Sequence, residues 1–187
     1  MPESEATLQY VANMLSELEH YLLSPEIFWP LSQRNSATPQ DRLTLGNLLL
    51  SLDQLDALRQ TWDAQKESQF LEIEMQWEQS QAKWKSAIER KAEHEISSRM
   101  NLWRAYLEDL EEGQGAMFDY GRELRNRVMI ERLFTLGVAR EPWEAELQRL
   151  DRLLQSLVIP SEYIWPQSTQ YHYPQVPYWF LYSRPRS

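Results

Sequence analysis

The sequence predicts an all-α protein, an elongated bundle of about five helices with one long central helix and an extended Pro/aromatic C-terminal strap. Apolar residues recur at helical spacings over about two thirds of the chain, well above the usual helical content. Glycine is scarce, at 5 of 187 residues. The last thirty residues contain five prolines, which prevent a continuing helix.

Two helices are expected in the N-terminal part. The first covers residues 4–23, because leucine and valine at spacings of three and four form one apolar stripe, and Pro25 ends it. The second begins at Thr38, a capping residue followed by proline at the first helical position, and continues to Trp62. The polar run 63–69 interrupts the apolar spacing, so we expect a bend or turn there.

The longest helical pattern runs from Phe70 to Leu110 and stops before Gly113. A helix of about forty-five residues would be roughly 67 Å long at 1.5 Å per residue. A compact domain of this size is only about 40 Å across. The helix therefore either projects as an arm or breaks, and a break is expected at 95–98, where two serines lower helix propensity.

Two further helices are expected before the strap. One covers residues 120–136 and ends at Gly137, and its apolar centre at Val128 places it inside the fold. The other begins at Pro142 and carries an amphipathic stripe as far as Leu157. Residues 1–157 are thus predicted to form one helical domain.

Residues 158–187 form the predicted strap, with eight aromatic side chains and no glycine. Disordered tails are poor in aromatics, so this segment is expected to lie on an apolar surface. Docking on its own domain is favoured for most of it, with 178–187 making contacts outward. The alternative is that the whole strap packs on another chain.

Composition argues against several classes of protein. A formal charge of −9 opposes a non-specific nucleic-acid or anionic-membrane surface. The chain has no cysteine, which removes thiolate nucleophiles and cysteine-ligated metals. Its N-terminal residues lack the basic and apolar regions of a signal peptide, and its most apolar run is far shorter than a membrane span. We expect a cytoplasmic protein without membrane contact.

The sequence contains only weak candidates for metal-binding or catalytic residues. Glu17 and His20 match a Glu-x-x-His metal-binding pattern, but the second copy that a di-iron bundle needs is missing, so no metal site or cofactor is expected. No serine-nucleophile elbow or phosphate-binding loop occurs in the sequence, so no catalytic residue is expected. The long helix also carries an acidic cluster that alternates with basic residues, which is typical of a solvent-exposed face: Glu89, Glu93, His94 and Glu95, beside Lys85, Arg90 and Lys91.

Arg122, Arg125 and Arg132 share one face of the helix at 120–136. Such a face suits phosphate or an acidic partner surface. It also suits pairing with the acidic residues at 108–112, which end the preceding helix, and this second interpretation is favoured.

These observations predict a non-catalytic helical protein that binds a protein partner or a second copy, as an adaptor, assembly factor or complex subunit. The alternative is an accessory subunit of a nucleic-acid-associated complex that contacts phosphate through the arginine face, although nucleic acid is not favoured. Tryptophan, tyrosine and arginine dominate interface hot spots. The predicted partner-binding residues are Trp77, Trp84, Tyr178, Trp179, Tyr182 and Arg184.

Overall fold

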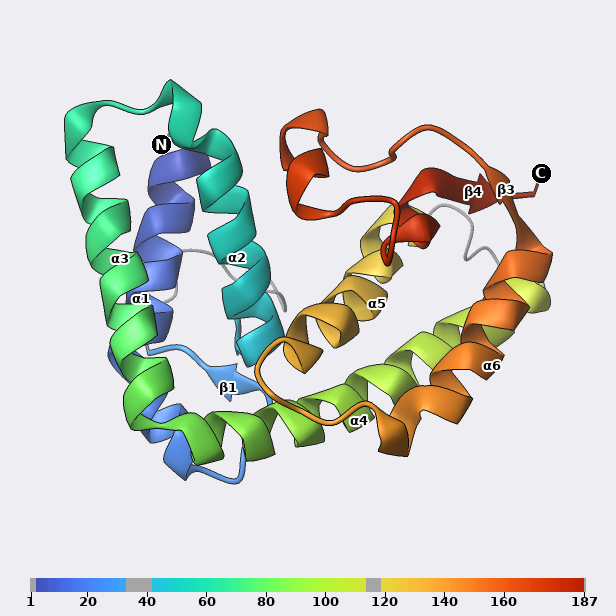
Figure 1. The fold of residues 1–187 in the computed structure, drawn as a ribbon, viewed down its shortest axis with the longest axis horizontal. Coiled ribbons are helices and arrows are strands. Elements are labelled where there is room, and N and C mark those ends of the chain that lie inside the picture. The colour runs from blue at the N-terminus through green and yellow to red at the C-terminus, as the bar shows by residue number, and fades with distance from the viewer. Residues whose placement is uncertain (1–2, 33–41, 114–118, 187) are drawn as a thin grey trace. The chain divides into compact units, whose positions relative to one another are not determined.

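The computed structural model describes residues 3–32, 42–113 and 119–186 (Figure 1). Helices make up most of this part of the chain, and its strands form only two short antiparallel pairs. The predicted all-α class is therefore confirmed. In the described residues no helix is both long enough and apolar enough to cross a membrane.

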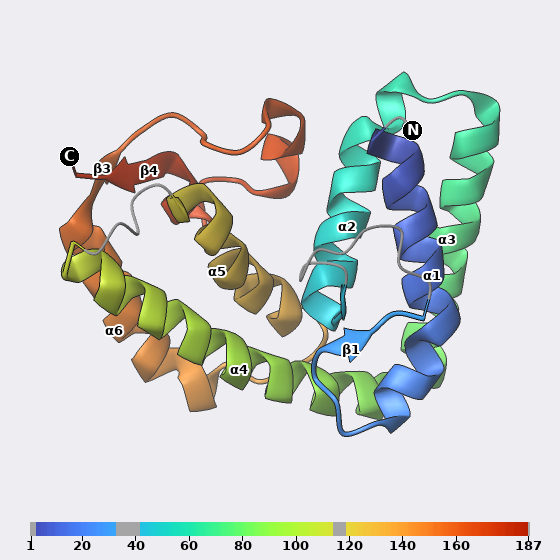
Figure 2. The ribbon, with the colours of Figure 1, turned by 180° about the vertical axis from the view of Figure 1, so that it is seen from behind.

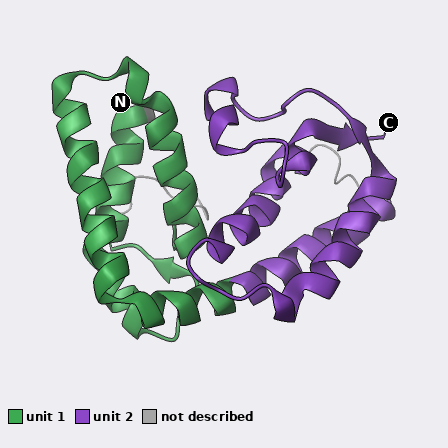
Figure 3. Cartoon of the chain, viewed as in Figure 1, with its two compact units in different colours: residues 1–95 green, residues 96–187 purple. Residues whose placement is uncertain are grey.

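The chain divides into two compact units, residues 1–95 and 96–187 (Figure 3). The division falls inside one helix, α4 (Lys85–Glu111). The sequence predicts a boundary at residue 157 instead, between a helical domain and the strap. In the structure the strap belongs to the second unit, together with the helices that precede it.

The first unit is helical, with α1 packed against both α2 and α3 (Figures 1 and 2). The two-residue strand β1 (Trp29–Pro30) pairs antiparallel with β2 (Arg42–Leu43). Leucines of α1 and α2 and aromatics of α3 fill the core. The helices of this unit are α1 (Glu3–Leu23), α2 (Leu45–Leu58), the short 3₁₀ helix η1 (Arg59–Thr61), α3 (Ala64–Lys83) and the start of α4.

Helix α2 begins later than predicted. Thr44 is its N-cap, and the Thr44 hydroxyl accepts a hydrogen bond of 3.0 Å from the amide of Asn47. The predicted start at Thr38 lies outside the described residues, and the extended pair at Arg42 shows that the helix starts after it. The predicted turn after α2 occurs at residues 59–63, slightly earlier than expected.

The long helix breaks at Trp84, and the predicted break at 95–98 is wrong. The backbone of Trp84 leaves helical geometry, with φ −114° and ψ 24°, and Figure 1 shows a sharp bend there. Trp77 is the last buried residue of α3 and Ala87 the first of α4, so no core contact holds the stretch between them straight. Buried Ile96, by contrast, anchors the serine-containing turn, which stays helical.

The second unit is built around α5, whose apolar side chains are largely buried. The predicted helices at 120–136 and from Pro142 to Leu157 are confirmed, and Gly137 follows α5 with a positive φ of 91°. Strand β3 directly continues α6 and pairs antiparallel with β4. The elements of this unit are the end of α4, α5 (Tyr120–Phe134), α6 (Glu141–Leu157), β3 (Val158–Pro160), η3 (Gln167–His172), η4 (Trp179–Tyr182) and β4 (Ser183–Pro185).

The strap is more compact than a simple extended segment. The strap begins with β3, continues through the two 3₁₀ helices η3 and η4, and ends with β4, which pairs with β3. From the sequence we expect residues 178–187 to face outward, yet Tyr178, Phe180 and Leu181 are buried. They turn inward because the return strand β4 pairs with β3 and draws the preceding turn against its own unit.

Candidate functional site

The structure separates the predicted partner-binding residues into two groups. Trp77 and Trp84 belong to the first unit, whereas Tyr178, Trp179, Tyr182 and Arg184 lie together in the strap of the second. In the strap group, Trp179 and Tyr182 are half-buried and Arg184 is exposed.

Two of the predicted contact residues are core residues. Trp77 and Tyr178 each keep only 7% of their surface exposed. Their ring faces are therefore occupied by their own units. Trp84 is half-buried at the bend, with the Lys83 ammonium 4.8 Å from the centre of its ring. The prediction of partner contact now rests on the more exposed strap residues.

The strap contains its own small aromatic core. Neighbouring rings meet edge to face, an arrangement worth about 0.5–1.5 kcal/mol per pair beyond area burial. The centroid separations are 5.5 Å for Trp165 and Tyr173, 5.1 Å for Tyr173 and Tyr178, and 6.1 Å for Tyr178 and Phe180. These contacts pack the aromatic side chains of the strap against one another.

Helix α5 anchors the strap through hydrogen bonds. The Tyr120 hydroxyl donates to the carbonyl of Phe180 at 3.1 Å and lies 2.7 Å from the hydroxyl of Ser183. The indole of Trp165 donates to the carbonyl of Gly121 at 2.8 Å. Burial raises the pKa of Tyr120 to about 12, so its hydroxyl remains a donor at neutral pH.

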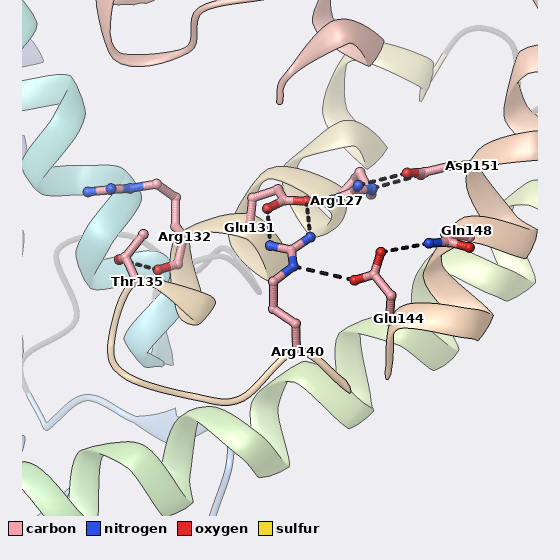
Figure 4. A network of polar contacts seen from close by, with 8 residues as sticks. All are labelled: Arg127, Glu131, Arg132, Thr135, Arg140, Glu144, Gln148 and Asp151. Carbon is pink, nitrogen blue, oxygen red and sulfur yellow. Dashed lines mark hydrogen bonds and ion pairs between the residues drawn. The ribbon is translucent and has the colours of Figure 1, made fainter. Parts of the chain in front are cut away.

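A charge network is centred on the buried Arg127 and Glu131 of α5 (Figure 4). Arg127 on α5 donates two hydrogen bonds of 2.9 Å to Asp151 on α6 and one of 2.8 Å to Glu131. Arg140, in the connection before α6, donates to the other oxygen of Glu131 at 2.7 Å. The network therefore joins α5, α6 and their connection.

The charges in this network stabilise one another. Burial by itself would raise the pKa of Glu131, but the hydrogen bonds and charges of Arg140 and Arg127 outweigh it, and the pKa is lowered. Burial likewise opposes charge on Arg127, and the hydrogen bond and charge of Asp151, with Glu131, raise the pKa of Arg127. Each guanidinium nitrogen of Arg127 has a carboxylate acceptor. This arrangement holds α5 and α6 together, and all three guanidinium nitrogens of Arg127 are engaged within the protein.

Sequence reasoning missed this network. Arg127 carries a recognisable signal, because Glu131 follows it at the i,i+4 spacing of a helical ion pair. Its partner Asp151 is 24 residues away, and no local pattern connects the two.

The predicted arginine face is only partly exposed to solvent. Arg122 is exposed, but it pairs with Asp119 and Glu123, each at 3.3 Å. Arg122 thus pairs with carboxylates at the start of α5, and the pairing of the arginine face with the acids at 108–112 stays a prediction. Arg125 and Arg132 are half-buried.

The acidic cluster on α4 is also less exposed than predicted. Glu95 is buried and accepts hydrogen bonds from the amide of Gly46, at the positive end of α2. Lys91 is buried too, and it donates to the carbonyls of Ser24 at 2.7 Å and Glu26 at 2.8 Å. Burial lowers the pKa of Lys91. These charges stay inside because backbone groups at neighbouring element ends satisfy them.

Glu17, from the Glu-x-x-His pattern, has a local structural role. Its two carboxylate oxygens accept hydrogen bonds of 2.8 Å from the indole of Trp29 and the amide of Ser32. The carboxylate thereby holds the segment after α1 against that helix. Within the described residues, no group of three or more histidines, aspartates and glutamates is placed to hold a metal ion.

One part of the strap points to solvent. We call Tyr171 and residues 174–177 the strap tip. Val176 is 84% exposed, the highest value among the large apolar side chains of the described residues, and Tyr171 is 60% exposed. A hydrogen bond of 3.2 Å from the amide of Tyr178 to the carbonyl of Pro174 closes the turn that carries Val176. Comparison with protein-family models, curated proteins and solved structures found no match for the chain.

Proposed function

We propose that this chain is a non-catalytic protein-interaction protein, an adaptor, assembly factor or complex subunit, that binds its partner through the strap tip. The observation that carries the proposal is the exposure of Val176 on a turn whose flanking side chains are buried, together with the exposure of Tyr171 at the end of the preceding η3. Exposed apolar side chains that form a patch mark interaction sites, and tyrosine is enriched among the residues that dominate binding energy.

The rigid support favours binding. Tyr173 and Tyr178 flank the turn and are buried in the aromatic core of the strap. Because the turn is already ordered, little conformational entropy remains to be lost on association. The buried Tyr173 and Tyr178 thus hold the turn in a conformation that leaves Val176 exposed to solvent.

Charge in the second unit favours an apolar contact over an electrostatic one. Residues 96–187 contain 11 basic and 12 acidic side chains, a difference of −1. The exposed Arg122 of the predicted phosphate-binding face is already paired with two carboxylates. A phosphate backbone would have to compete with those carboxylates, so a nucleic-acid role has weaker support.

The experiment is affinity purification of the tagged full-length chain, followed by quantitative mass spectrometry and chemical cross-linking. The test variant carries Tyr171→Ser and Val176→Ser. The matched control carries Leu102→Ser, another exposed apolar residue of the same unit. We expect one or more partners to cross-link near the strap tip, to be lost with the double variant, and to be retained by the control. Retention of the same partners by the double variant would contradict the proposal.

A further inference from the structure

The outer face of α3 carries an exposed apolar stripe in the first unit. Leu71 and Met75 are 48% and 53% exposed and lie one helical turn apart. They are on the side of α3 away from its buried residues Phe70, Ile73 and Trp77. Met75 adds a flexible, polarizable side chain that adapts to different partner shapes.

Small residues extend this stripe at both ends. Ala64 precedes Leu71 by seven residues and Ala82 follows Met75 by seven, so all four lie along one line of the helix, and all four are exposed. A seven-residue repeat of this kind matches the contact line of a second helix packed along α3. We call Ala64, Leu71, Met75 and Ala82 the α3 stripe.

Acidic residues border the α3 stripe on one side. Helical spacing places Glu67, Glu74 and Glu78 along this border. Arg59 lies among them, with its Nε 2.8 Å from Glu67 and a guanidinium nitrogen 3.9 Å from Glu74. Arg59 also lies 3.6 Å from Asp56. One arginine thus faces three carboxylates.

Glu74 lies among these charges, and its pKa is raised. Burial first, and then the neighbouring Asp56, Glu78 and Glu67, raise the pKa of Glu74, although Arg59 opposes them. The charge of the whole unit has the same sign: residues 1–95 contain 16 acidic and 8 basic side chains, a difference of −8. The border therefore favours a cationic neighbour.

We propose that the α3 stripe and its acidic border dock a basic amphipathic helix of a partner protein. The apolar side of that helix would lie on Leu71 and Met75, and its lysines or arginines would meet Glu74 and Glu78. Helix docking of this kind is recognised by apolar anchors at i,i+4 spacing. The complementary charge selects a basic helix over an acidic one and speeds association. This surface is separate from the strap tip and does not depend on it.

The test uses a fluorescein-labelled peptide of about twenty residues, long enough to form a helix on binding. Leucines occupy its heptad a and d positions, and lysines occupy most others. Two control peptides share its length: one has the same composition with the leucines scattered, and one has glutamate in place of lysine. Binding to the full-length chain is followed by fluorescence anisotropy at low and high salt.

We expect the amphipathic basic peptide to bind at least about tenfold more tightly than either control peptide, and more weakly at high salt. The variant Leu71→Ser with Met75→Ser, and separately Glu78→Lys, should each weaken binding about tenfold. Leu102→Ser and the strap-tip double variant should leave it unchanged. These residues are exposed, so the variants should fold normally, which circular dichroism checks.

Three results would overturn the proposal. The first is equal affinity for the scattered-leucine peptide, which would mean that only charge is recognised. The second is unchanged binding by the Leu71 and Met75 double variant. The third is self-association of the chain that this double variant abolishes in sedimentation experiments, since the stripe would then be covered by a second copy.

Discussion

The guanidinium carbon of Arg127 lies 4.8 Å from the centre of the Phe180 ring, a cation–π contact that connects the buried charge network to the strap. The same arginine pairs with Asp151 on α6 and Glu131 on α5. One side chain thus contacts α5, α6 and the strap. The stability of the strap and the stability of the second unit are therefore expected to change together.

Replacing Arg127 tests this coupling. Arg127→Ala leaves Glu131 buried with only part of its pairing and removes the partner of Asp151, so we expect the free energy of unfolding to fall by about 3–5 kcal/mol. Urea denaturation followed by circular dichroism measures the change. Arg122→Ala, an exposed arginine on the same helix, is the control and should change stability by less than about 0.5 kcal/mol. Similar losses in both variants would contradict the role of Arg127.

Removing the strap should destabilise the protein. Truncation after Pro160 deletes the buried Tyr173, Phe180 and Leu181 and leaves Tyr120 without its partners in the strap. We expect a lower melting temperature, increased aggregation and stronger binding of a hydrophobic dye. Differential scanning calorimetry and dye fluorescence measure these effects. An unchanged melting temperature would mean that the strap contributes nothing to its own unit.

Glu95 should matter for the stability of the first unit. Glu95→Ala removes the carboxylate that accepts from the amide of Gly46, and leaves that buried donor without this acceptor. The expected loss is about 1–3 kcal/mol in the free energy of unfolding. Glu93→Ala, at an exposed position on the same helix, is the control. A loss no larger than that of the control would contradict this role for Glu95.

The second unit should lose stability in acid. The hydrogen bond from Arg149, with that from Arg104, lowers the pKa of Glu146 from 4.5 to about 2. A carboxyl group with a lowered folded-state pKa adds stability that is present above its unfolded pKa and is lost as the pH falls through the folded value. Glu131, whose pKa is also lowered, contributes in the same direction.

Urea unfolding at several pH values between about 7 and 2 measures this loss, which is expected below about pH 4.5. Glu146→Gln should flatten the pH dependence, because the variant has no carboxylate to protonate at this position. Glu162→Gln, at an exposed position in the strap, should retain the pH dependence of the unaltered chain. An identical pH dependence in Glu146→Gln would exclude a contribution from this carboxyl group.

Helix periodicity predicted the elements with continuous apolar stripes. Helices α1, α5 and α6 were predicted nearly to their ends, since each buries one regular face. The sequence predicts the bend at the two serines of 95–98, whereas the structure places it at Trp84, between the buried Trp77 and Ala87. Burial of Ile96 contributes more than the small propensity cost of two serines.

The site residues were harder to predict than the helices. Charged residues are normally exposed, so the burial of Arg127, Lys91 and Glu95 goes against the usual expectation. Their partners are distant in sequence, such as Asp151 for Arg127 and Gly46 for Glu95. The composition of the strap indicated a contact-forming segment, but which aromatics turn inward depends on the pairing of β3 with β4.

The central claim is that the strap is an ordered part of the second unit and that its tip is left for a partner. Hydrogen exchange with mass spectrometry on the full-length chain tests this most directly. We predict slow exchange at the amides of Ser161, Ile164 and Arg186, which donate to backbone carbonyls within the unit, and fast exchange at residues 175–176. Uniformly fast exchange over residues 161–186 would contradict the claim.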